Sequence, residues 1–599
     1  MSATLSIRLT TSWRALVAFT LVVGPAAYVC LALASDPTSL GTLDWDKMEA
    51  YRQFATTSFL RFHQFPFWDP YGCGGHPYWS DPEAGTTIVS ALLPAYLWLP
   101  LAAAIRLEIV VALAAALAGA WVLAGLFCRD PILRAVVCIL AVLNSRWALH
   151  AASGHPWHLS YAALPWSIVA FLRADDATAS RGRSLVLAST CLAMMVYAGG
   201  IYPFPHAVLA IGLYAAFVSY HRRNWKTIAR ALLCFLLAVG LAAPKLLPLV
   251  DTMSKYPRIV SSREYLDPIS YLLTFAMPSW ARSLWPYWDL DYGYYEYGIY
   301  VGLLGVGVLI FGAWRAPVDL ELRGFRFVAL AFFWLSLGLF GPWVLLHLVP
   351  PFRSQHVPFR FAYPGLLFLA IVSAADIERR LNKARISGAW NRWWGAVTIA
   401  IATTIVADVA YESHRCLAQG FGVHPPQVTA HPTYVQTFDV PFALSYPEAN
   451  MRASLGLHLA NVGSILCGTF HAFNIDAWKA NGARPRGLGA RGLGEPEYRG
   501  EAFLDGDGTA DFVEWTPNKM VVQVHGARPG DLLVLNQNFD ESWRANGTPT
   551  LDRHSVNAYR LTASDERVSF TYRPRTLWLG VFAAFVSLAV VFNLLLRSS

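Results

Sequence analysis

Residues 86–104 read TTIVSALLPAYLWLPLAAA, and whether this apolar run crosses a membrane decides the arrangement of the whole chain. Its length is close to the ~20 residues that span the hydrocarbon core of a bilayer as a helix. Pro94 and Pro100 interrupt it, however, and only Arg106–Glu108 separate it from the next apolar stretch. The run therefore has to be interpreted together with the other apolar segments and the charged links between them.

The composition places most of the chain in a lipid bilayer. Of the 599 residues, 55% are hydrophobic and 14% are charged, whereas about 25% are charged in soluble domains. This excludes a disordered protein, a coiled coil and an ordinary soluble enzyme. Besides residues 86–104, the stretches that predict membrane-spanning helices are 13–35, 107–127, 131–146, 160–172, 184–200, 204–220, 227–248, 298–314, 325–347, 361–377, 393–412 and 575–596.

Basic residues orient these predicted helices, because Lys and Arg favour the cytoplasmic side of short loops. The basic links are 128–134, 173–183, 221–230, 315–326 and 379–392. If residues 86–104 do not cross, all of these links fall on the side of the N-terminus, which carries Arg8 and Arg14. We therefore expect residues 86–104 to be re-entrant or interfacial, with about twelve crossings, or thirteen helices if they do cross. The same bias explains the net charge of +8, and we expect no nucleic-acid partner.

The predicted fold is an α-helical polytopic membrane protein with a β-rich domain before its last helix. A transmembrane domain, 1–413, would include outer loops 36–85 and 250–297. The polar segment 414–574 alternates apolar and polar residues in its last part and is expected outside the cytoplasm. Residues 575–599 would form the last helix, and the first would be an uncleaved anchor in a plasma membrane. A disulfide between Cys416 and Cys467 stays open.

The first outer loop contains the leading candidates for chemistry. It opens with Asp44-Trp45-Asp46 and ends near Glu83. Carboxylates at a membrane interface can act as general bases or hold a divalent cation. The alternative is an ordinary anionic loop with a belt of aromatic residues.

Polar residues of later outer segments are further candidates. His155 and His158 have the spacing of one helical turn, although each can equally be an interfacial histidine bonded to a neighbour. A metal ion would need ligands from elsewhere, and Asp44 or Glu83 could supply them. Glu296 lies at a membrane entry, where a carboxylate is costly unless it is paired or functional.

Several short motifs, taken in order, resemble bacterial YfhO-like membrane proteins, which are grouped with the GT-C superfamily of glycosyltransferases. The first is Asp44-Trp45-Asp46 followed by Phe65-Pro66-Phe67-Trp68-Asp69-Pro70-Tyr71 and Cys73-Gly74-Gly75. The others are Gly154-His155 with Leu164-Pro165-Trp166, Tyr295-Glu296-Tyr297-Gly298, Pro350-Pro351-Phe352-Arg353, Pro358-Phe359-Arg360-Phe361, 539–543 and 570–574. Together they cover nearly the whole chain.

The resemblance implies a membrane glycosyltransferase that moves a sugar from a polyprenyl-phosphate donor to a lipid, glycan or protein acceptor outside the bacterial plasma membrane, with inversion. It makes Asp44 the first choice and Asp46 the second choice of base. Arg353, Arg360 and Lys255 would contact the donor phosphate, for which the planar Arg fork is suited. Snorkelling of the arginines and a solvated basic loop are the alternatives. The residues expected at the substrate or acceptor site are Trp45, Glu83, His155, His158 and Glu296.

Three questions stay open at the level of the sequence. The loop 145–160 lacks the second acidic motif of many GT-C enzymes, so a requirement for Mg²⁺ or Mn²⁺, held by Asp44, Glu83 and His155, is not decided. A lipid-linked-sugar flippase or other transporter is a second possible function, but it would be expected to carry charged residues inside its spans, and the predicted spans are nearly free of them. A non-catalytic scaffold of envelope polysaccharide assembly is the third.

Overall fold

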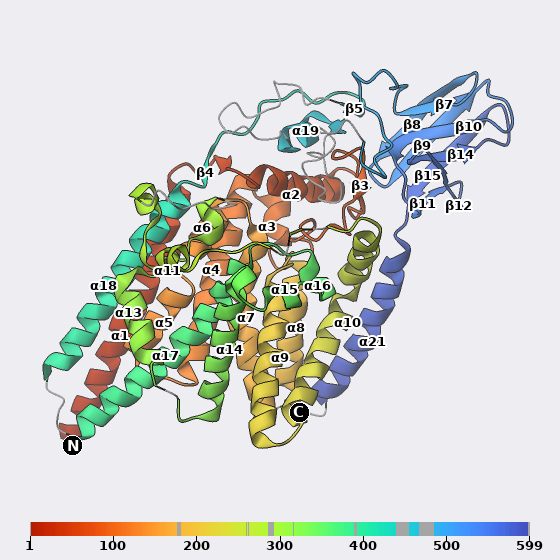
Figure 1. Ribbon diagram of the computed structural model, residues 1–599. Helices are drawn as coiled ribbons and strands as arrows, with labels where there is room; N and C mark the ends of the chain where they lie inside the picture. The colour runs from red at the N-terminus through yellow and green to blue at the C-terminus, as the bar shows by residue number, and fades with distance from the viewer. Residues whose placement is uncertain are drawn as a thin grey trace.

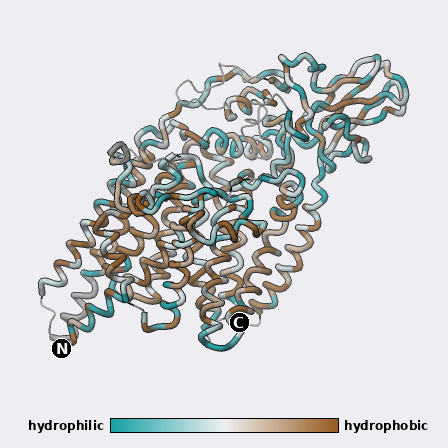
Figure 2. Tube along the Cα trace, in the orientation of Figure 1, coloured by the Kyte–Doolittle hydropathy of each residue, from teal (hydrophilic) through white to brown (hydrophobic). Residues whose placement is uncertain are grey.

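The computed structural model describes residues 2–176, 181–258, 260–261, 263–284, 293–315, 317–387, 392–438, 454–465 and 484–596. It shows a bundle of long helices that has both chain termini at one end and short helices and β-sheets at the other (Figure 1). Apolar residues follow the bundle, and hydrophilic residues are concentrated toward the end that carries the sheets (Figure 2). The molecule is therefore a membrane-embedded body with one elaborate polar face.

The bundle has a helix at each stretch where the sequence predicts a crossing. Its helices are α1 (Ser2–Leu31), α4 (Leu101–Gly125), α5 (Pro131–Ala141), α6 (Ser145–Ala152), α7 (Ala163–Asp175), α8 (Arg181–Tyr197), α9 (Pro203–Arg222), α10 (Lys226–Lys255), α13 (Gly302–Ala313), α14 (Leu320–Ser336), α17 (Ala362–Ile386), α18 (Arg392–Ala418) and α21 (Arg575–Leu596). In the described part of the chain, nine candidate spans are long and apolar enough to cross a membrane. The shorter α7, α8 and α14 also lie in the bundle, and both chain termini lie at one end of it (Figure 1). The expected number of about twelve crossings stays a prediction.

Residues 86–104 do not form a span. They comprise turns, the six-residue helix α3 (Leu93–Trp98) and the first turn of α4. Pro100 separates the two helices in an extended conformation with ψ of 143°. A helix of six residues is only about 9 Å long, far less than the ~30 Å hydrocarbon core. The structure thus favours the interfacial interpretation of this run.

The boundaries of two spans differ from the prediction. The predicted helix 131–146 breaks before Asn144, whose side chain accepts a hydrogen bond from the backbone N–H of Arg146 and caps α6. The predicted helix 325–347 ends at Ser336, after which the chain forms the short helices η4 (Gly338–Phe340) and α15 (Trp343–Leu346). Both breaks lie at the end of the bundle that carries the sheets (Figure 1).

Short elements cover that end of the bundle. The helical ones are η1 (Ala32–Ala34), α2 (Trp45–Leu60), η2 (Pro156–Ala162), α11 (Pro268–Ala276), η3 (Ser279–Leu284), α12 (Tyr294–Tyr297), α16 (Pro350–Arg353), η5 (Pro358–Phe361) and α19 (Ser454–Ala460). Three strand pairs lie among them: β1 (Leu40–Gly41) with β4 (Phe421–Val423), β2 (Trp68–Asp69) with β3 (His76–Pro77), and β5 (Val435–Thr437) with β6 (Val462–Ser464).

The region before the last helix is rich in β-strands, as predicted. Its larger sheet has the order β12 (Thr548–Pro549), β11 (Trp543–Ala545), β15 (Glu566–Tyr572), β9 (Lys519–His525), β8 (Thr509–Thr516). The smaller has the order β13 (Leu551–Arg553), β14 (Val556–Arg560), β10 (Leu532–Asn538), β7 (Ala502–Leu504). All these pairings are antiparallel. Alternate residues such as Val522, Leu533 and Val568 are buried in one core between the sheets.

The first outer loop is built into this β-rich region. Trp68 is buried in the core between the two sheets, where its ring packs against Trp543 and Tyr572. Its Nε1 donates to Oε1 of Gln537 at 2.8 Å. The Asn538 side chain donates to the carbonyl of Gly75 at 2.9 Å, and its backbone N–H donates to that of Gly74. The aromatic and glycine motif of this loop therefore serves to dock it.

The disulfide between Cys416 and Cys467 that the sequence left open does not form. Cys416 has a free thiol, so it is not paired with Cys467, which lies outside the described residues. Cys73, in the first outer loop, is in a disulfide instead. This bond adds a covalent constraint to the segment that docks on the sheets.

Candidate active site

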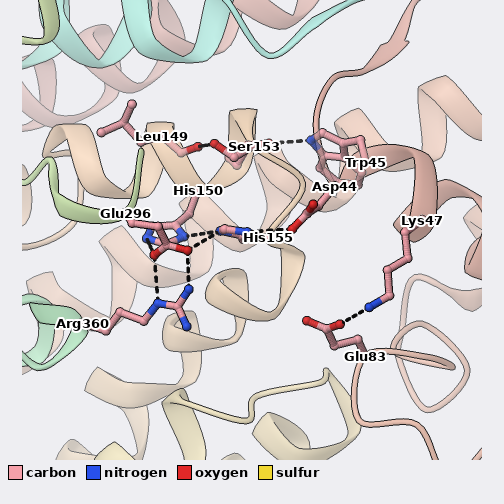
Figure 3. A network of polar contacts seen from close by, with 11 residues as sticks. Asp44, Trp45, Lys47, Glu83, Leu149, His150, Ser153, His155, Glu296 and Arg360 are labelled. Carbon is pink, nitrogen blue, oxygen red and sulfur yellow. Dashed lines mark hydrogen bonds and ion pairs between the residues drawn. The ribbon is translucent and has the colours of Figure 1, made fainter. Parts of the chain in front are cut away.

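A chain of polar contacts joins Asp44, His155, His150, Glu296 and Arg360 (Figure 3). Oδ2 of Asp44 lies 3.1 Å from Nε2 of His155, and Nδ1 of His155 lies 2.8 Å from Nδ1 of His150. The Glu296 carboxylate lies 3.8 Å from His155 and 4.0 Å from His150. Arg360 grips that carboxylate with two N–H groups, one at 3.0 Å. The five residues come from four separate segments, since only His150 and His155 are close along the chain, so the network exists only in the folded chain.

Asp44 is the solvent-exposed end of this network. Its side chain is 62% exposed, whereas that of His155 is 8% exposed. Asp44 immediately precedes α2 but does not cap it with its side chain, so the carboxylate is free to face His155. A carboxylate that is held by one oxygen and open to solvent at the other is suited to take a proton from a hydroxyl group.

The backbone around Asp44 is fixed by a close approach of two loops. Leu43 has φ of +56° and Gly154 has φ of +81°, conformations that L residues rarely adopt. The backbone N–H of Asp44 donates to the carbonyl of Ser153 at 3.1 Å. A Cβ on Gly154 would lie 2.1 Å from the backbone nitrogen of Trp45. Glycine at this position therefore lets His155 reach Asp44.

Asp46 and Trp45 make structural contacts. The Asp46 carboxylate accepts hydrogen bonds from the backbone N–H groups of Ser454 and Leu455, at 2.8 and 3.1 Å, and so caps α19. Burial raises the pKa of Asp46 to about 6, against the lowering effect of these two bonds. Trp45 is fully buried, and its Nε1 donates to the carbonyl of Ala151. Neither side chain opens to the surface beside Asp44.

Glu83 and Lys255 are held in ion pairs. Glu83 pairs with Lys47 at 2.5 Å, apart from the chain of contacts that begins at Asp44 (Figure 3). Lys255 pairs with Asp251 and, more weakly, with Glu541. Lys255 was expected to contact the donor phosphate, but two carboxylates already neutralise part of its charge.

Arg353 and Arg360 have opposite surroundings. Arg353 is exposed at the end of α16, and no described residue pairs with its side chain. Arg360 is 3% exposed, and its guanidinium lies over the rings of Trp157 and Tyr202 at 4.7 and 4.1 Å. Its Nη1 has no partner among the described residues. Arg353 is thus the more accessible of the two cations, and Arg360 is part of the buried network.

His158 extends the network inside the protein. Its ring stacks on that of His150 with centroids 4.4 Å apart and lies 4.7 Å from that of Tyr363. Burial, aided by Arg146, holds the pKa of His158 well below its usual value, so this ring is neutral. A neutral His158 adds bulk to the stack of rings but no charge.

Sequence reasoning missed His150 and Arg146. His150 touches His155 and Arg146 donates to the backbone carbonyl of Glu296 at 2.7 Å, and both are fully buried. They lie four residues apart on α6, hence on one helix face. The spacing of four residues could have indicated a shared helix face, but the predicted helix 131–146 ended before His150.

The expectation that the spans are nearly free of charge is also wrong in part. Arg146, Glu296, Arg360 and Lys245 all fall within candidate spans and are buried. The first three form the network described above. Lys245 donates from Nζ to three backbone carbonyls of the first outer loop, each at 2.8 Å. Glu296 and Arg360 thus pair with each other, and Arg146 and Lys245 donate to backbone carbonyls.

A metal site is possible in part of the network. His150, His155 and Glu296 offer ligand atoms within 4.8 Å of one another. However, Arg360 donates a hydrogen bond to each carboxylate oxygen of Glu296. The positive guanidinium would repel a metal ion bound to the same carboxylate. Glu83, which the sequence suggested as a ligand beside Asp44 and His155, is paired with Lys47 instead.

Comparisons with known proteins identify the architecture. No family model and no curated protein matches the sequence. Among solved structures, the arabinofuranosyltransferase AftD from Mycobacteria is similar, with a TM-score of 0.50 and 14% identity over 91% of this chain. The chain spans 40% of the length of AftD.

Two further structures are more distantly similar. ArnT from Cupriavidus metallidurans, solved with undecaprenyl phosphate, has a TM-score of 0.47 and 11% identity over 78% of this chain and 88% of its own. The archaeal oligosaccharyltransferase AglB from Archaeoglobus fulgidus, solved with an inhibitory peptide and a dolichol-phosphate, has a TM-score of 0.41 and 15% identity over 76% and 65%. The resemblance to YfhO-like proteins stays a prediction. The chain has a GT-C-like fold.

Proposed function

We propose that this protein is a membrane glycosyltransferase that moves a sugar from a polyprenyl-phosphate donor to a lipid, glycan or protein acceptor. The reaction would occur at the face that carries α2, which we take to be the outer face of a bacterial plasma membrane. One observation carries the proposal: Asp44 is an exposed carboxylate fixed at the mouth of a buried ionic network. The similarity of the fold to an arabinofuranosyltransferase supports it.

In this proposal Asp44 is the general base. Its carboxylate takes the proton of an acceptor hydroxyl, and the hydroxyl oxygen attacks the anomeric carbon of the sugar. The phosphate leaves with the bonding electrons, so a single displacement inverts the configuration. Negative charge grows on the phosphate during this step and requires a cation nearby. Arg353 is the accessible candidate, because it is exposed and unpaired in the described part of the chain.

The test compares two neighbouring carboxylates. The purified full-length protein, in proteoliposomes, is given a panel of radiolabelled sugars on undecaprenyl phosphate together with membrane lipid acceptors, and products are separated by chromatography. Asp44→Asn is expected to lower turnover by at least about 10²-fold. Asp46→Asn is the matched control, since its amide oxygen can still accept one of the two hydrogen bonds from the start of α19. Equal turnover of Asp44→Asn and wild-type protein would refute the role of Asp44.

A lipid-linked-sugar transporter is the second candidate, because charged residues are buried inside the candidate spans. Intramembrane charges mark substrate or ion pathways in transporters. The same proteoliposomes separate the two functions. A transporter moves the labelled lipid between leaflets without making a new glycosidic bond, whereas an enzyme yields a glycosylated acceptor. A scaffold would do neither.

A further inference from the structure

The contact between His150 and His155 restricts where protons can lie. Their Nδ1 atoms are 2.8 Å apart, and two lone pairs or two N–H groups at this distance would repel each other. One proton must therefore lie between the rings. A neutral imidazole has its proton on one nitrogen only, so the ring that carries this shared proton has a bare Nε2.

The outer neighbour of His155 determines which ring that is. Nε2 of His155 lies 3.1 Å from Oδ2 of Asp44, and an ionised carboxylate can only accept a hydrogen bond. His155 must therefore carry a proton on Nε2. If the ring is neutral, its Nδ1 is the acceptor, and the proton between the rings belongs to His150.

The inner neighbours disfavour the other arrangement, in which His155 is a cation. His150 would then carry its proton on Nε2, but the nearest Glu296 oxygen is 4.0 Å away, too far for a hydrogen bond. Nε2 of His150 has no hydrogen-bond partner among the described residues. Glu296 lies 3.8 Å from Nδ1 of His155, but Arg360 already neutralises its carboxylate, and Arg146 adds a further positive charge, so this side of the ring does not favour an additional one. His158 is neutral and does not change this balance.

We propose that His150 is a positioning residue that locks His155 in the tautomer with a proton on Nε2, and that His155 then holds Asp44 by Oδ2. Oδ1 of Asp44 is left open toward solvent and takes the proton of the acceptor hydroxyl. The assignment of Asp44 as the base rests on the proposed glycosyltransferase function, whereas the tautomer lock follows from the contacts alone.

The protons and electrons balance without further reactants. The O–H bond of the acceptor breaks, and its proton moves to Oδ1 of Asp44. The acceptor oxygen forms the new bond to the anomeric carbon, and the bond from that carbon to the donor phosphate oxygen breaks with its electron pair staying on the phosphate. His155 keeps its proton on Nε2 and His150 keeps its proton on Nδ1 throughout.

The first experiment observes the tautomers directly and needs no substrate. Protein with ¹⁵N-labelled histidine, in lipid bilayers near neutral pH, is examined by solid-state NMR. Signals of the two rings are assigned by their loss in His155→Gln and His150→Asn. We expect His155 to show a protonated Nε2 and a bare Nδ1, and His150 the reverse. A signal for His155 as an imidazolium, or with its proton on Nδ1, would overturn the proposal.

The second experiment tests the consequence for turnover. His150→Asn keeps an N–H donor on a short side chain, whereas His150→Leu has a similar size but no donor. We expect His150→Leu to lower the rate about 10²-fold and His150→Asn to restore most of it, with the donor KM similar in both. A His150→Leu variant as active as wild type contradicts the positioning role. If the wild-type protein transfers no sugar although the spectra are as expected, the glycosyltransferase assignment fails and the tautomer lock stands.

Discussion

Replacing Gly154 by Ala is the most direct test of how the site is assembled. This glycine has φ of +81°, where an L residue costs about 1 kcal/mol or more. The new Cβ would lie 2.1 Å from the backbone nitrogen of Trp45 and 2.4 Å from the carbonyl carbon of Asp44, whereas ordinary contact begins near 3.4 Å. The two loops must therefore separate by 3.4 − 2.1, or about 1.3 Å.

That displacement is enough to break the contact between Asp44 and His155. If the full separation falls on this contact, their 3.1 Å hydrogen bond would lengthen to about 4.4 Å, beyond hydrogen-bond reach. The bond from the Asp44 N–H to the Ser153 carbonyl would weaken with it. Because a misplacement of about 1 Å at a reacting centre costs roughly 10²-fold in rate, Gly154→Ala is expected to lose turnover by about that factor and to unfold at a lower temperature.

Sugar transfer in proteoliposomes and thermal unfolding in detergent are the two assays. Gly212→Ala in α9 is the matched control, since a Cβ there meets no atom within 4 Å, and Ala favours a helix over Gly by about 1 kcal/mol. The control is expected to keep its turnover and to unfold at the same or a slightly higher temperature. A Gly154→Ala variant that turns over within about threefold of wild type would show that the close approach does not position Asp44.

Three further predictions concern the segments that support the site. Burial raises the pKa of Asp46 to about 6, above its unfolded value of about 3.9, so the folded state binds a proton more tightly and stability falls as pH rises from about 4 to about 6. The thermal midpoint of wild-type protein should therefore fall over this pH range, and that of Asp46→Asn should not. An unchanged slope in Asp46→Asn would show that Asp46 does not cause it. Trp68→Ala removes the indole buried between the sheets and should lower stability by about 3–5 kcal/mol, which is measured as faster proteolysis of the first outer loop. Trp98→Ala, at a side chain that is 79% exposed, is the control and should be cleaved as slowly as wild type. Lys245→Leu leaves three backbone carbonyls without their donor, which costs about 1–3 kcal/mol for each carbonyl and should lower the yield of folded protein. Lys226→Leu, at an exposed residue, is the control. Equal yields of the two variants would argue against a structural role of Lys245.

The helical body could be predicted because hydropathy and the distribution of bases are averaged over many residues. Residues 86–104 could be predicted not to cross the membrane, because the basic links then lie on one side and prolines such as Pro100 interrupt the run. Boundaries were less predictable, because the break before Asn144 depends on one capping side chain. The free thiol of Cys416 was equally hidden, since disulfide pairing depends on distances in the folded chain.

The site could be predicted only in part. Asp44, His155, Glu296 and Arg360 were named as candidates from the sequence, and the structure brings them into one network. Glu83 was grouped with Asp44 because both lie in the first outer loop, but it pairs with Lys47. Closeness along the chain does not determine which way a side chain points.

The docking of Trp68 has a consequence for the order of events during synthesis. Its partner Gln537 follows it by 469 residues, and β11 and β15, which enclose its ring, are later still. While the ribosome is still making the C-terminal third, the loop with Asp44 has been translated but has nowhere to seat its indole. The loop that carries Asp44 is therefore fixed in place last although it is translated first, and a nascent or truncated chain lacks the segments on which this loop docks.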